Sequence, residues 1–229
     1  MKLSVIIPIY NEFKTLEEIL KRIKNQTHIE KEIILIDDFS TDGSRELIEN
    51  KLKSKVQKII LNEKNYGKGY SVRQGIEIAE GDIILIQDAD LEYSPTDYDK
   101  LVNPILNNDA DIVYGSRFIG SEAKRIIYFS HRLANFIITT LVNALTNINF
   151  SDVEVGYKLI KADLIKQINL KENSFAIEIE LTMKLSKLNV KFYEVGISYN
   201  GRTYSEGKKI SLKDAFIALY KIFYYRFFN

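Results

Sequence analysis

Short apolar runs and amphipathic segments alternate along the first half of the chain, and each kind predicts a different element. Five runs rich in β-branched residues predict buried strands, at Leu3–Ile9, Glu32–Ile36, Val56–Leu61, Asp82–Ile86 and Asp111–Tyr114. Between them apolar residues recur at helical spacing and predict helices, at Thr15–Asn25, Ser44–Lys53, Tyr70–Ala79 and Pro95–Leu106. The alternation predicts an α/β fold, a mostly parallel sheet flanked by helices on both faces.

The second half of the chain has a less regular pattern. Its predicted elements are two amphipathic helices, a strand and a final helix, at Ser130–Thr146, Ala176–Leu188, Val190–Ile197 and Ser211–Phe228. No internal repeat, low-complexity tract or Pro/Gly-rich linker interrupts the chain. We therefore expect one structural unit, in which residues 1–210 form the main domain and residues 211–229 form a C-terminal amphipathic helix.

Composition narrows the classes of function. The 229 residues suit a single domain, and 45% hydrophobic residues are enough to build a core. The formal net charge of +1 argues against a dedicated nucleic-acid-binding protein, which would normally be strongly basic. The absence of Cys excludes disulfides, a thiol nucleophile and Cys-ligated zinc, and two His are too few for a His-rich metal centre. No signal peptide or membrane-spanning apolar run is predicted.

Polar clusters follow most of the predicted strands. They are Tyr10-Asn11-Glu12, Asp37-Asp38, residues 65–69, residues 88–92 and Gly115-Ser116-Arg117. In open parallel sheets, ligands bind beyond the carboxyl ends of the strands. The pattern therefore predicts a ligand site at that edge of the sheet.

The pair Asp88 and Asp90 is the strongest local signal. Both follow a buried strand and project to the same side, because side chains alternate along a strand with a period of two. Two converging carboxylates repel each other unless a cation joins them, and they suit a hard divalent ion that also holds a diphosphate. An EF-hand loop is excluded, since Tyr93 and Asp99 stand where it needs Gly and Glu. An Asp-rich loop that only caps a helix is the alternative interpretation.

Two further clusters suit a nucleotide. In the segment 65–69, Lys68 stands between two glycines at a helix start, where backbone N–H groups and the helix dipole attract an anion. A plain strand-to-helix turn is the alternative there. Asp37 and Asp38 end the second predicted strand and suit sugar hydroxyls or base N–H donors, with helix capping as the alternative.

Five motifs in chain order resemble glycosyltransferase family 2. They are VIIPIYNE at 5–12, DDFSTDGS at 37–44, NYGKG at 65–69, DADLEY at 88–93 and GSRF at 115–118. Segments 151–158, 175–181 and 199–210 are typical of its dolichyl-phosphate mannose synthase-like branch, whose bacterial members often use undecaprenyl phosphate. The resemblance implies a GT-A fold, which is the Rossmann-like sheet predicted above, and a nucleotide-sugar-dependent glycosyltransferase.

The resemblance also implies residue roles. Donor-binding residues would be Pro8, Tyr10, Asn11, Glu12, Asp37, Asp38, Lys68, Asp88, Ala89 and Asp90. Mg²⁺ or Mn²⁺ would be held by Asp88, Asp90 and Glu92, and would act as a Lewis acid on the leaving diphosphate. Catalytic residues would be Asp90, Arg117, Arg132 and Arg202. The three arginines suit phosphate because a guanidinium fork matches its geometry, although each has an ordinary surface role as its alternative.

The implied reaction is metal-dependent and inverting, from a GDP- or UDP-sugar to a polyprenyl phosphate. A phosphate acceptor is mostly ionised at neutral pH, with a second pKa of about 6, and needs positioning rather than a strong base. One alternative is transfer to a glycan hydroxyl in cell-surface polysaccharide synthesis, with Asp152, Glu178 or Glu180 as the base. Glu178 and Glu180 lie two apart on a predicted helix, so only one of them would point into the site. A second alternative is a non-catalytic nucleotide-binding protein at the membrane surface.

Aromatic and basic residues crowd the C-terminal end. The aromatic residues are Phe216, Tyr220, Phe223, Tyr224, Tyr225, Phe227 and Phe228. Such a helix suits the headgroup layer of a membrane, and packing on the core or on a second copy of the chain in a homodimer is the alternative. We expect a cytoplasmic protein, peripheral at the membrane face and docked there directly or through a membrane-anchor protein. The basic segment 202–209 is expected to close over the donor diphosphate.

Overall fold

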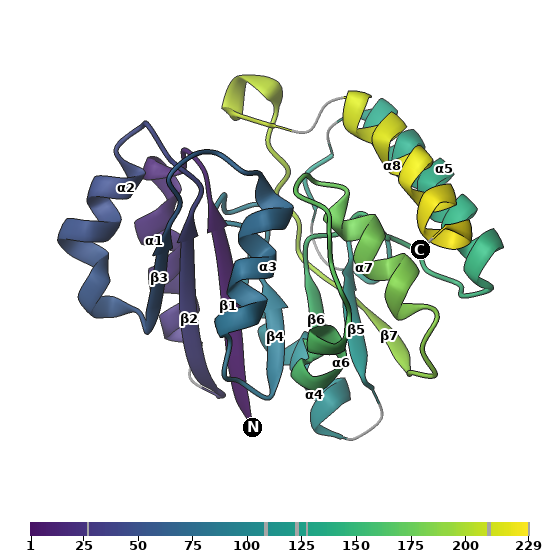
Figure 1. The fold of residues 1–229 in the computed structure, drawn as a ribbon, viewed down its shortest axis with the longest axis horizontal. Coiled ribbons are helices and arrows are strands. Elements are labelled where there is room, and N and C mark those ends of the chain that lie inside the picture. Colours follow the sequence, from purple (N-terminus) through teal and green to yellow (C-terminus); the bar gives the residue numbers. More distant parts are fainter. Residues whose placement is uncertain (27, 108–109, 122–123, 127, 210–211, 229) are drawn as a thin grey trace.

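The computed structural model describes residues 1–26, 28–107, 110–121, 124–126, 128–209 and 212–228. A seven-stranded sheet runs through the molecule in the order β3-β2-β1-β4-β6-β5-β7, with helices on both faces (Figure 1). The strands are β1 Lys2–Ile9, β2 Glu30–Asp37, β3 Lys58–Leu61, β4 Ile83–Ile86, β5 Ile112–Ser116, β6 Lys158–Lys161 and β7 Phe192–Gly196. The α-helices are α1 Phe13–Asn25, α2 Ser44–Leu47, α3 Lys68–Ile78, α4 Tyr98–Leu106, α5 Phe129–Thr146, α6 Ala162–Gln167, α7 Ile177–Leu185 and α8 Leu212–Phe227. This is the predicted α/β architecture.

The central strands form the core because they are buried on both faces. Val5, Ile6 and Ile7 of β1 are fully buried, as are Ile34 and Leu35 of β2. Burial on both faces explains why these strands read as continuous apolar runs rather than alternating ones.

The helix α3 packs closely on β1 and β2 because it has a glycine at the contact. A Cβ added at Gly75 would stand 2.4 Å from Cγ2 of Ile6. The helix begins at Lys68, two residues before the predicted start at Tyr70, since Gly67 takes a φ of 100° immediately before it. Lys68 therefore lies on the first turn of α3, beside the carboxyl ends of β1 and β2.

Several predicted elements have different bounds in the structure, and three of them illustrate this. The helix expected at Ser44–Lys53 is a single α-turn, α2, followed by a π-helical turn at Ile48–Leu52 and a 3₁₀ turn at Lys53–Lys55. The third strand begins at Lys58 rather than Val56. The helix expected from Pro95 starts with a 3₁₀ turn, Pro95–Asp97, before α4. These are boundary changes that leave the order of elements intact.

The strand β6 is the important departure, because the sequence pattern does not predict it. It lies between β4 and β5 and runs antiparallel to both, whereas all other paired strands are parallel. An antiparallel strand starts at the edge where its parallel neighbours end. Residues just before Lys158 therefore lie at the same edge as the residues that follow β4 and β5.

The C-terminal helix α8 packs against α5 and α7, and α5 and α8 lie side by side in Figure 1. Its inner face buries Ala218, Ile222 and Tyr225, and the Tyr225 hydroxyl donates to Oε1 of Glu172 at 2.5 Å. The predicted boundary at 210/211 falls outside the described residues. Within the part of the chain that the structure describes, no helix is long and apolar enough to cross a membrane.

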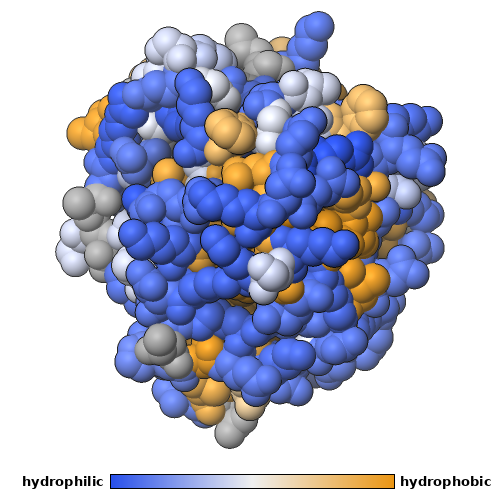
Figure 2. Space-filling view, turned by 90° about the vertical axis from the view of Figure 1, so that its left-hand side faces the viewer, coloured by the Kyte–Doolittle hydropathy of each residue, from blue (hydrophilic) through white to orange (hydrophobic). Residues whose placement is uncertain are grey.

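The outer faces of α5 and α8 expose large apolar side chains. On α5 these include Phe129 and Phe136, 77% and 65% exposed, and on α8 they include Phe216 and Tyr220, 73% and 63% exposed. The opposite end of the molecule, over α2 and β3, presents mainly hydrophilic residues (Figure 2). The aromatic excess of the C-terminal end is thus divided between a packed inner face and an exposed outer face.

Candidate active site

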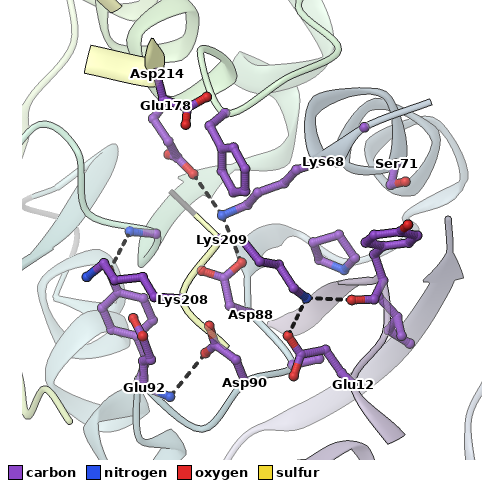
Figure 3. A pocket seen from close by; sticks show the side chains of 18 of the residues that line it. Glu12, Lys68, Ser71, Asp88, Asp90, Glu92, Glu178, Lys208, Lys209 and Asp214 are labelled. Carbon is purple, nitrogen blue, oxygen red and sulfur yellow. Dashed lines mark hydrogen bonds and ion pairs between the residues drawn. The ribbon is translucent and has the colours of Figure 1, made fainter. Parts of the chain in front are cut away.

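A pocket of about 370 Å³ opens at the carboxyl edge of the sheet. Its lining comes from the ends of β1, β2, β4 and β5, the start of α3, the segment before β6, the start of α7, the 202–209 loop and α8. Figure 3 shows acidic and basic side chains converging in it from these separate elements. The edge predicted from the polar clusters is therefore the edge where the pocket lies.

Three of these strand ends contain a non-glycine residue in the left-handed region. Asn11, Phe39 and Leu91 have φ angles of 54°, 65° and 64°, and follow β1, β2 and β4 respectively. Such conformations are rare for residues with a Cβ and concentrate where a loop must take a particular shape. They turn the chain sharply at the pocket edge.

The carboxylates after β4 are held in a tight turn. Oδ1 of Asp90 accepts a hydrogen bond from the Glu92 N–H at 3.1 Å, and the Tyr199 hydroxyl donates to Glu92 at 2.9 Å. Burial, together with the negative charges of Asp88 and Glu92, raises the pKa of Asp90 to about 7. A bound cation would favour the charged form of Asp90 and lower this pKa.

Lys68 bridges two acidic residues on opposite sides of the pocket (Figure 3). Its Nζ lies 2.8 Å from Oδ1 of Asp88 and 3.3 Å from Oε1 of Glu178. Although burial opposes it, the attraction of Asp88 and Glu178 raises the pKa of Lys68 above its ordinary value, so the amine is charged. Lys68 thereby fixes the position of Asp88.

The 202–209 loop supplies two cations to the same cluster. Nη2 of Arg202 lies 2.6 Å from Oδ2 of Asp90, and its Nε lies 3.4 Å from Oε1 of Glu92. Nζ of Lys209 lies 2.6 Å from Oε1 of Glu12, which also receives Arg202 at 3.4 Å. The loop therefore lies over the acidic cluster through charged contacts rather than through apolar packing.

The acidic cluster has the donor chemistry for a divalent metal ion. Asp88, Asp90 and Glu92 offer carboxylate oxygens, the ligands that Mg²⁺ and Mn²⁺ prefer. Within the described residues, no three His, Cys, Asp or Glu side chains are already arranged to hold a metal ion. Lys68 and Arg202 instead bind oxygens of Asp88 and Asp90. The donor set fits a divalent ion, provided that Arg202 moves away from Asp90.

Arg117 forms the basic side of the pocket, after β5. Its Nε and Nη2 bind the two carboxylate oxygens of Asp152, each at 2.7 Å, and the Arg117 N–H donates to the same group at 3.1 Å. The side-chain amide of Asn135, on α5, donates a further hydrogen bond to Oδ1 of Asp152 at 2.8 Å. Because two nitrogens of the Arg117 guanidinium bind both oxygens of Asp152, the guanidinium is held in one orientation at the pocket wall.

The predicted donor residues divide into two groups. The pocket is lined by Pro8, Tyr10, Glu12, Asp38, Lys68, Asp88, Ala89 and Asp90. Asp37 and Asn11 lie outside that lining. Asp37 is fully buried beneath Arg45, 3.3 Å away, and Asn11 accepts a hydrogen bond from the Thr41 N–H at 2.8 Å. In this structure both of these residues hold the loop after β2.

Asp38 shapes the pocket as well as lining it. Its carboxylate accepts hydrogen bonds from the N–H groups of Tyr66 and Gly67, at 2.9 and 2.7 Å. It also accepts from the Asn62 side chain at 2.9 Å. Asp38 therefore fixes the loop that leads into α3 and places Lys68 in the pocket.

The predicted catalytic arginines are not all together. Arg117, Arg202 and the acidic residues share the pocket, but Arg132 is exposed on α5 and stacks over Phe118 at 5.7 Å. His131 beside it has a structural contact, Nε2 to the Tyr204 hydroxyl at 2.9 Å. Arg132 therefore lies outside the pocket lining in this structure.

The candidate bases for a hydroxyl acceptor are engaged elsewhere. Asp152 binds Arg117, as described, and Glu180 points away from the pocket, where it accepts from the N–H groups of Lys171 and Glu172 and pairs with Lys184 at 2.7 Å. Glu178 does reach the pocket, and its Oε2 lies 2.5 Å from Nζ of Lys158. The prediction that only one of Glu178 and Glu180 points inward is confirmed.

The sequence interpretation missed several pocket residues, among them Lys208 and Glu154. Lys208 lines the pocket and lies in the basic segment 202–209. The sequence interpretation assigned a role to that segment as a whole and not to Lys208 itself. Glu154 also lines the pocket, and it stands in the 151–158 segment that supports the family resemblance. The signal that would have found Glu154 is the antiparallel direction of β6, which no local pattern reveals.

The fold and this pocket define an α/β protein with a ligand site at the carboxyl edge of its sheet, where acidic and basic side chains converge. The chain belongs to glycosyltransferase family 2: the family model, described as glycosyl transferase family 2, matches residues 4–168.

Individual relatives agree with this assignment. The chain is 31% identical to a dolichol-phosphate mannosyltransferase of Pyrococcus furiosus, over 92% of this chain and 61% of that protein. It is 29% identical to the glycosyltransferase GlyG of Streptococcus pneumoniae, over 79% of this chain and 63% of that protein. The chain thus spans about three fifths of the length of these two curated relatives.

Solved structures share the GT-A fold. One is glucosyl-3-phosphoglycerate synthase of Mycobacterium tuberculosis in complex with Mn²⁺, UDP and glucosyl-3-phosphoglycerate. It matches with a TM-score of 0.75 at 18% identity, and the match covers 98% of this chain and 78% of that chain. The Rossmann-like GT-A architecture expected from the sequence is confirmed.

Proposed function

We propose that the protein transfers a sugar from a nucleotide sugar to a polyprenyl phosphate, with Mg²⁺ or Mn²⁺ at the acidic cluster. One observation carries the proposal. A single pocket joins the carboxylates Asp88 and Asp90 to the fixed guanidinium of Arg117, and it opens beside α8, whose outer face is aromatic. The relationship to a dolichol-phosphate mannosyltransferase supports the same class of acceptor.

The donor binds on the side of the pocket formed by β1, β2 and α3. Tyr10, Asp38 and the start of α3 bind the nucleoside, and Asp88, Asp90 and Glu92 hold the metal ion. The metal supplies Lewis-acid stabilisation of the diphosphate. A structural neighbour that binds Mn²⁺ and UDP supports this assignment.

The acceptor phosphate binds against Arg117 and Lys208. Burial, with help from the nearby positive charge of Arg117, lowers the pKa of Lys208. A bound phosphate would place a negative charge beside both cations and favour the charged form of Lys208. A lipid phosphate approaching past α8 would reach this group first.

The reaction is a displacement that needs no strong base. An oxygen of the acceptor phosphate forms a bond to the anomeric carbon of the sugar as the bond from that carbon to the donor diphosphate oxygen breaks. The nucleoside diphosphate leaves with the bonding electron pair, and Lys68 and Arg202 stabilise its negative charge. Because the acceptor oxygen is already ionised near pH 7, Arg117 contributes by positioning it. In-line attack inverts the anomeric configuration.

The exposed apolar face of α5 and α8 binds the membrane surface, at the cytoplasmic leaflet where the acceptor headgroup lies. Asp214 and Ala218 of α8 line the pocket, so the same helix that carries Phe216 and Tyr220 outward reaches the active site inward. Aromatic residues with basic neighbours favour the headgroup layer. Docking of this face would bring the acceptor phosphate to the pocket without a spanning helix.

A donor panel tests the proposal. The protein is incubated with Mn²⁺, undecaprenyl phosphate and radiolabelled GDP- and UDP-sugars in turn, and the label is counted after extraction into organic solvent. We expect one donor to give organic-phase label that disappears with EDTA and falls at least 100-fold in Asp90→Asn. Label only in a water-soluble glycan would overturn the acceptor assignment.

A further inference from the structure

Glu154 lies between the two halves of the proposed reaction. In the sheet order β1-β4-β6-β5, the metal-binding carboxylates follow β4 and Arg117 follows β5. The antiparallel β6 lies between those strands, so its leading segment enters the pocket edge between them. Close contact confirms the position of this segment, because a Cβ added at Gly156 would stand 2.6 Å from Oδ2 of Asp88.

The Glu154 side chain opens into the pocket. Glu154 is the one residue between Asp152 and Ile160 that is partly exposed, and all the others in that range are buried. Glu154 lines the pocket. The charges that act on it come from several elements: Lys158 of β6, Glu178 of α7, Arg117 after β5 and Asp152 before β6. The carboxyl group therefore faces the space between the diphosphate and the acceptor phosphate.

Glu154 also lacks a partner, unlike the other pocket carboxylates. Within the described residues no hydrogen bond or ion pair ends on its side chain, whereas Asp88 binds Lys68 and Asp152 binds Arg117. A second oxygen nearby is similar: Oε1 of the buried Glu178 makes no hydrogen bond, although Lys68 lies 3.3 Å away. A ligand hydroxyl would supply a hydrogen bond that these oxygens lack.

From this placement we infer that Glu154 is a specificity residue that accepts a hydrogen bond from a hydroxyl group of the transferred sugar, with Glu178 nearby. The inference rests on the proposed function, because the sugar is the group that lies between the leaving diphosphate and the acceptor phosphate. Two carboxyl groups at this position favour a neutral, hydroxyl-rich hexose. They disfavour a uronate, whose own carboxylate they would repel.

Binding measurements test the inference without an acceptor. The dissociation constants of a nucleoside diphosphate and its nucleotide hexose are measured by calorimetry with Mn²⁺, using GDP with GDP-mannose and UDP with UDP-glucose. The proteins are wild type, Glu154→Gln, Glu154→Ala and the matched control Glu49→Gln, an exposed carboxylate remote from the pocket. Thermal unfolding of each protein checks the fold.

We expect both Glu154 variants to bind the nucleoside diphosphate within about twofold of wild type and the nucleotide hexose about tenfold more weakly, which is 1.4 kcal/mol. Wild type should discriminate against the matching uronate donor, and Glu154→Gln should narrow that difference. Glu49→Gln should match wild type throughout.

Three results would overturn the inference, and they are distinguishable. If the folded variants bind nucleotide hexose as wild type does, Glu154 does not contact the sugar and the proposed function stands. If binding is unchanged but transfer to a glycan hydroxyl is lost, Glu154 is instead a general base. If wild type binds no nucleotide sugar, the proposed function itself fails.

Discussion

At the scale of single residues, the pocket is organised by ion pairs of two kinds. Lys68 with Asp88 and Arg117 with Asp152 join residues on the framework of the fold, and they fix its walls. Arg202 with Asp90 joins the framework to a loop. Pairs of the first kind hold the geometry, and under the proposed function the pair of the second kind would separate when a metal ion binds Asp90.

Asp90 gives the simplest residue test. Asp90→Asn removes one oxygen ligand and should lower turnover about 100-fold or more, with weaker Mn²⁺ binding in electron paramagnetic resonance titrations. The fold should be retained, because the substitution removes one of several like charges. Asp99→Asn, at an exposed site on α4, is the matched control and should keep full activity. Normal Mn²⁺ affinity in Asp90→Asn would contradict the metal assignment.

Asp152 should matter for stability more than for chemistry. Asp152→Asn leaves the Arg117 guanidinium without its carboxylate in a buried setting, which should lower the free energy of unfolding by about 3 kcal/mol. Urea unfolding measures the loss. A change below about 1 kcal/mol would show that Arg117 does not depend on this pair.

The raised pKa of Glu154 predicts that the free energy of unfolding depends on pH. Burial is the main reason that its pKa is raised from 4.5 to about 7. Glu178 and Asp152 also act to raise the pKa, and Lys158 and Arg117 act to lower it. Between these pH values the folded state keeps a proton that the unfolded state has released, so stability falls as pH rises through the window. Glu154→Gln should remove up to about 3 kcal/mol of that fall. Urea unfolding at pH 5 and pH 8 should show a larger gain for the variant at pH 8, and an equal gain at both would refute the raised pKa.

At the scale of elements, the 202–209 loop is the part of the site that is expected to move. Its contacts with the framework are mainly charged, and Gly207 has a φ of 93° at the end of its 3₁₀ turn. Contacts of this kind can be exchanged for metal and phosphate contacts at little cost. The loop would therefore close over the diphosphate when donor and metal are bound.

Arg202 tests the role of the loop. Arg202→Gln should lower turnover at least tenfold while leaving the unfolding temperature nearly unchanged, because Arg202 lies on the loop and outside the hydrophobic core. Arg125→Gln is the matched control, since Arg125 pairs with Glu206 on the outer side of the same loop at 2.7 Å. Stopped-flow and steady-state assays measure the effect. Equal turnover in both variants would remove Arg202 from the reaction.

The elements also show how far the sequence could lead. Fully buried parallel strands such as β1 and β4 leave continuous apolar runs, and the acidic residues after them follow directly from strand geometry. β6 is only four residues long and is defined by antiparallel pairing with β4 and β5, which are remote in sequence. Local patterns contain no information on such pairing, so Glu154 was missed.

Side-chain roles at the strand ends were harder to predict than positions. Asp37 and Asp38 are adjacent, and alternation along a strand predicts that they point to opposite sides without saying which one reaches the pocket. The structure separates them, because Arg45 covers Asp37 while Asp38 binds the N–H groups of the loop before α3. Tertiary partners decide which of the two reaches the pocket.

At the scale of the whole molecule, the active site and the aromatic face share one helix. α8 lines the pocket through Ala218 and exposes Phe216 and Tyr220 on its outer side. The far end of the molecule, over α2 and β3, is mainly hydrophilic (Figure 2). We propose that the exposed aromatic face of α5 and α8 is the one that meets the membrane, which would orient the pocket toward it.

Vesicle binding tests that orientation. Wild type should sediment with vesicles containing anionic lipids, and Phe216→Asp combined with Tyr220→Asp should lose most of that binding without losing donor binding. Leu106→Asp, which alters an exposed apolar residue on α4, is the control and should sediment as wild type does. If wild type stays in the supernatant and the double variant converts a dimer to a monomer in light scattering, the face binds a second copy of the chain instead.

The most direct test of the proposed reaction compares two lipids that differ only in the phosphate. The protein is given Mn²⁺ and its preferred labelled nucleotide sugar with either undecaprenyl phosphate or undecaprenol, and the lipid product is counted and identified by mass spectrometry. Arg117 is held in place to bind a phosphate, and the proposed reaction needs no general base. We therefore expect labelled undecaprenyl phosphate that carries one sugar, and no labelled undecaprenol. Label on undecaprenol, or on neither lipid but on a glycan hydroxyl, would contradict the account.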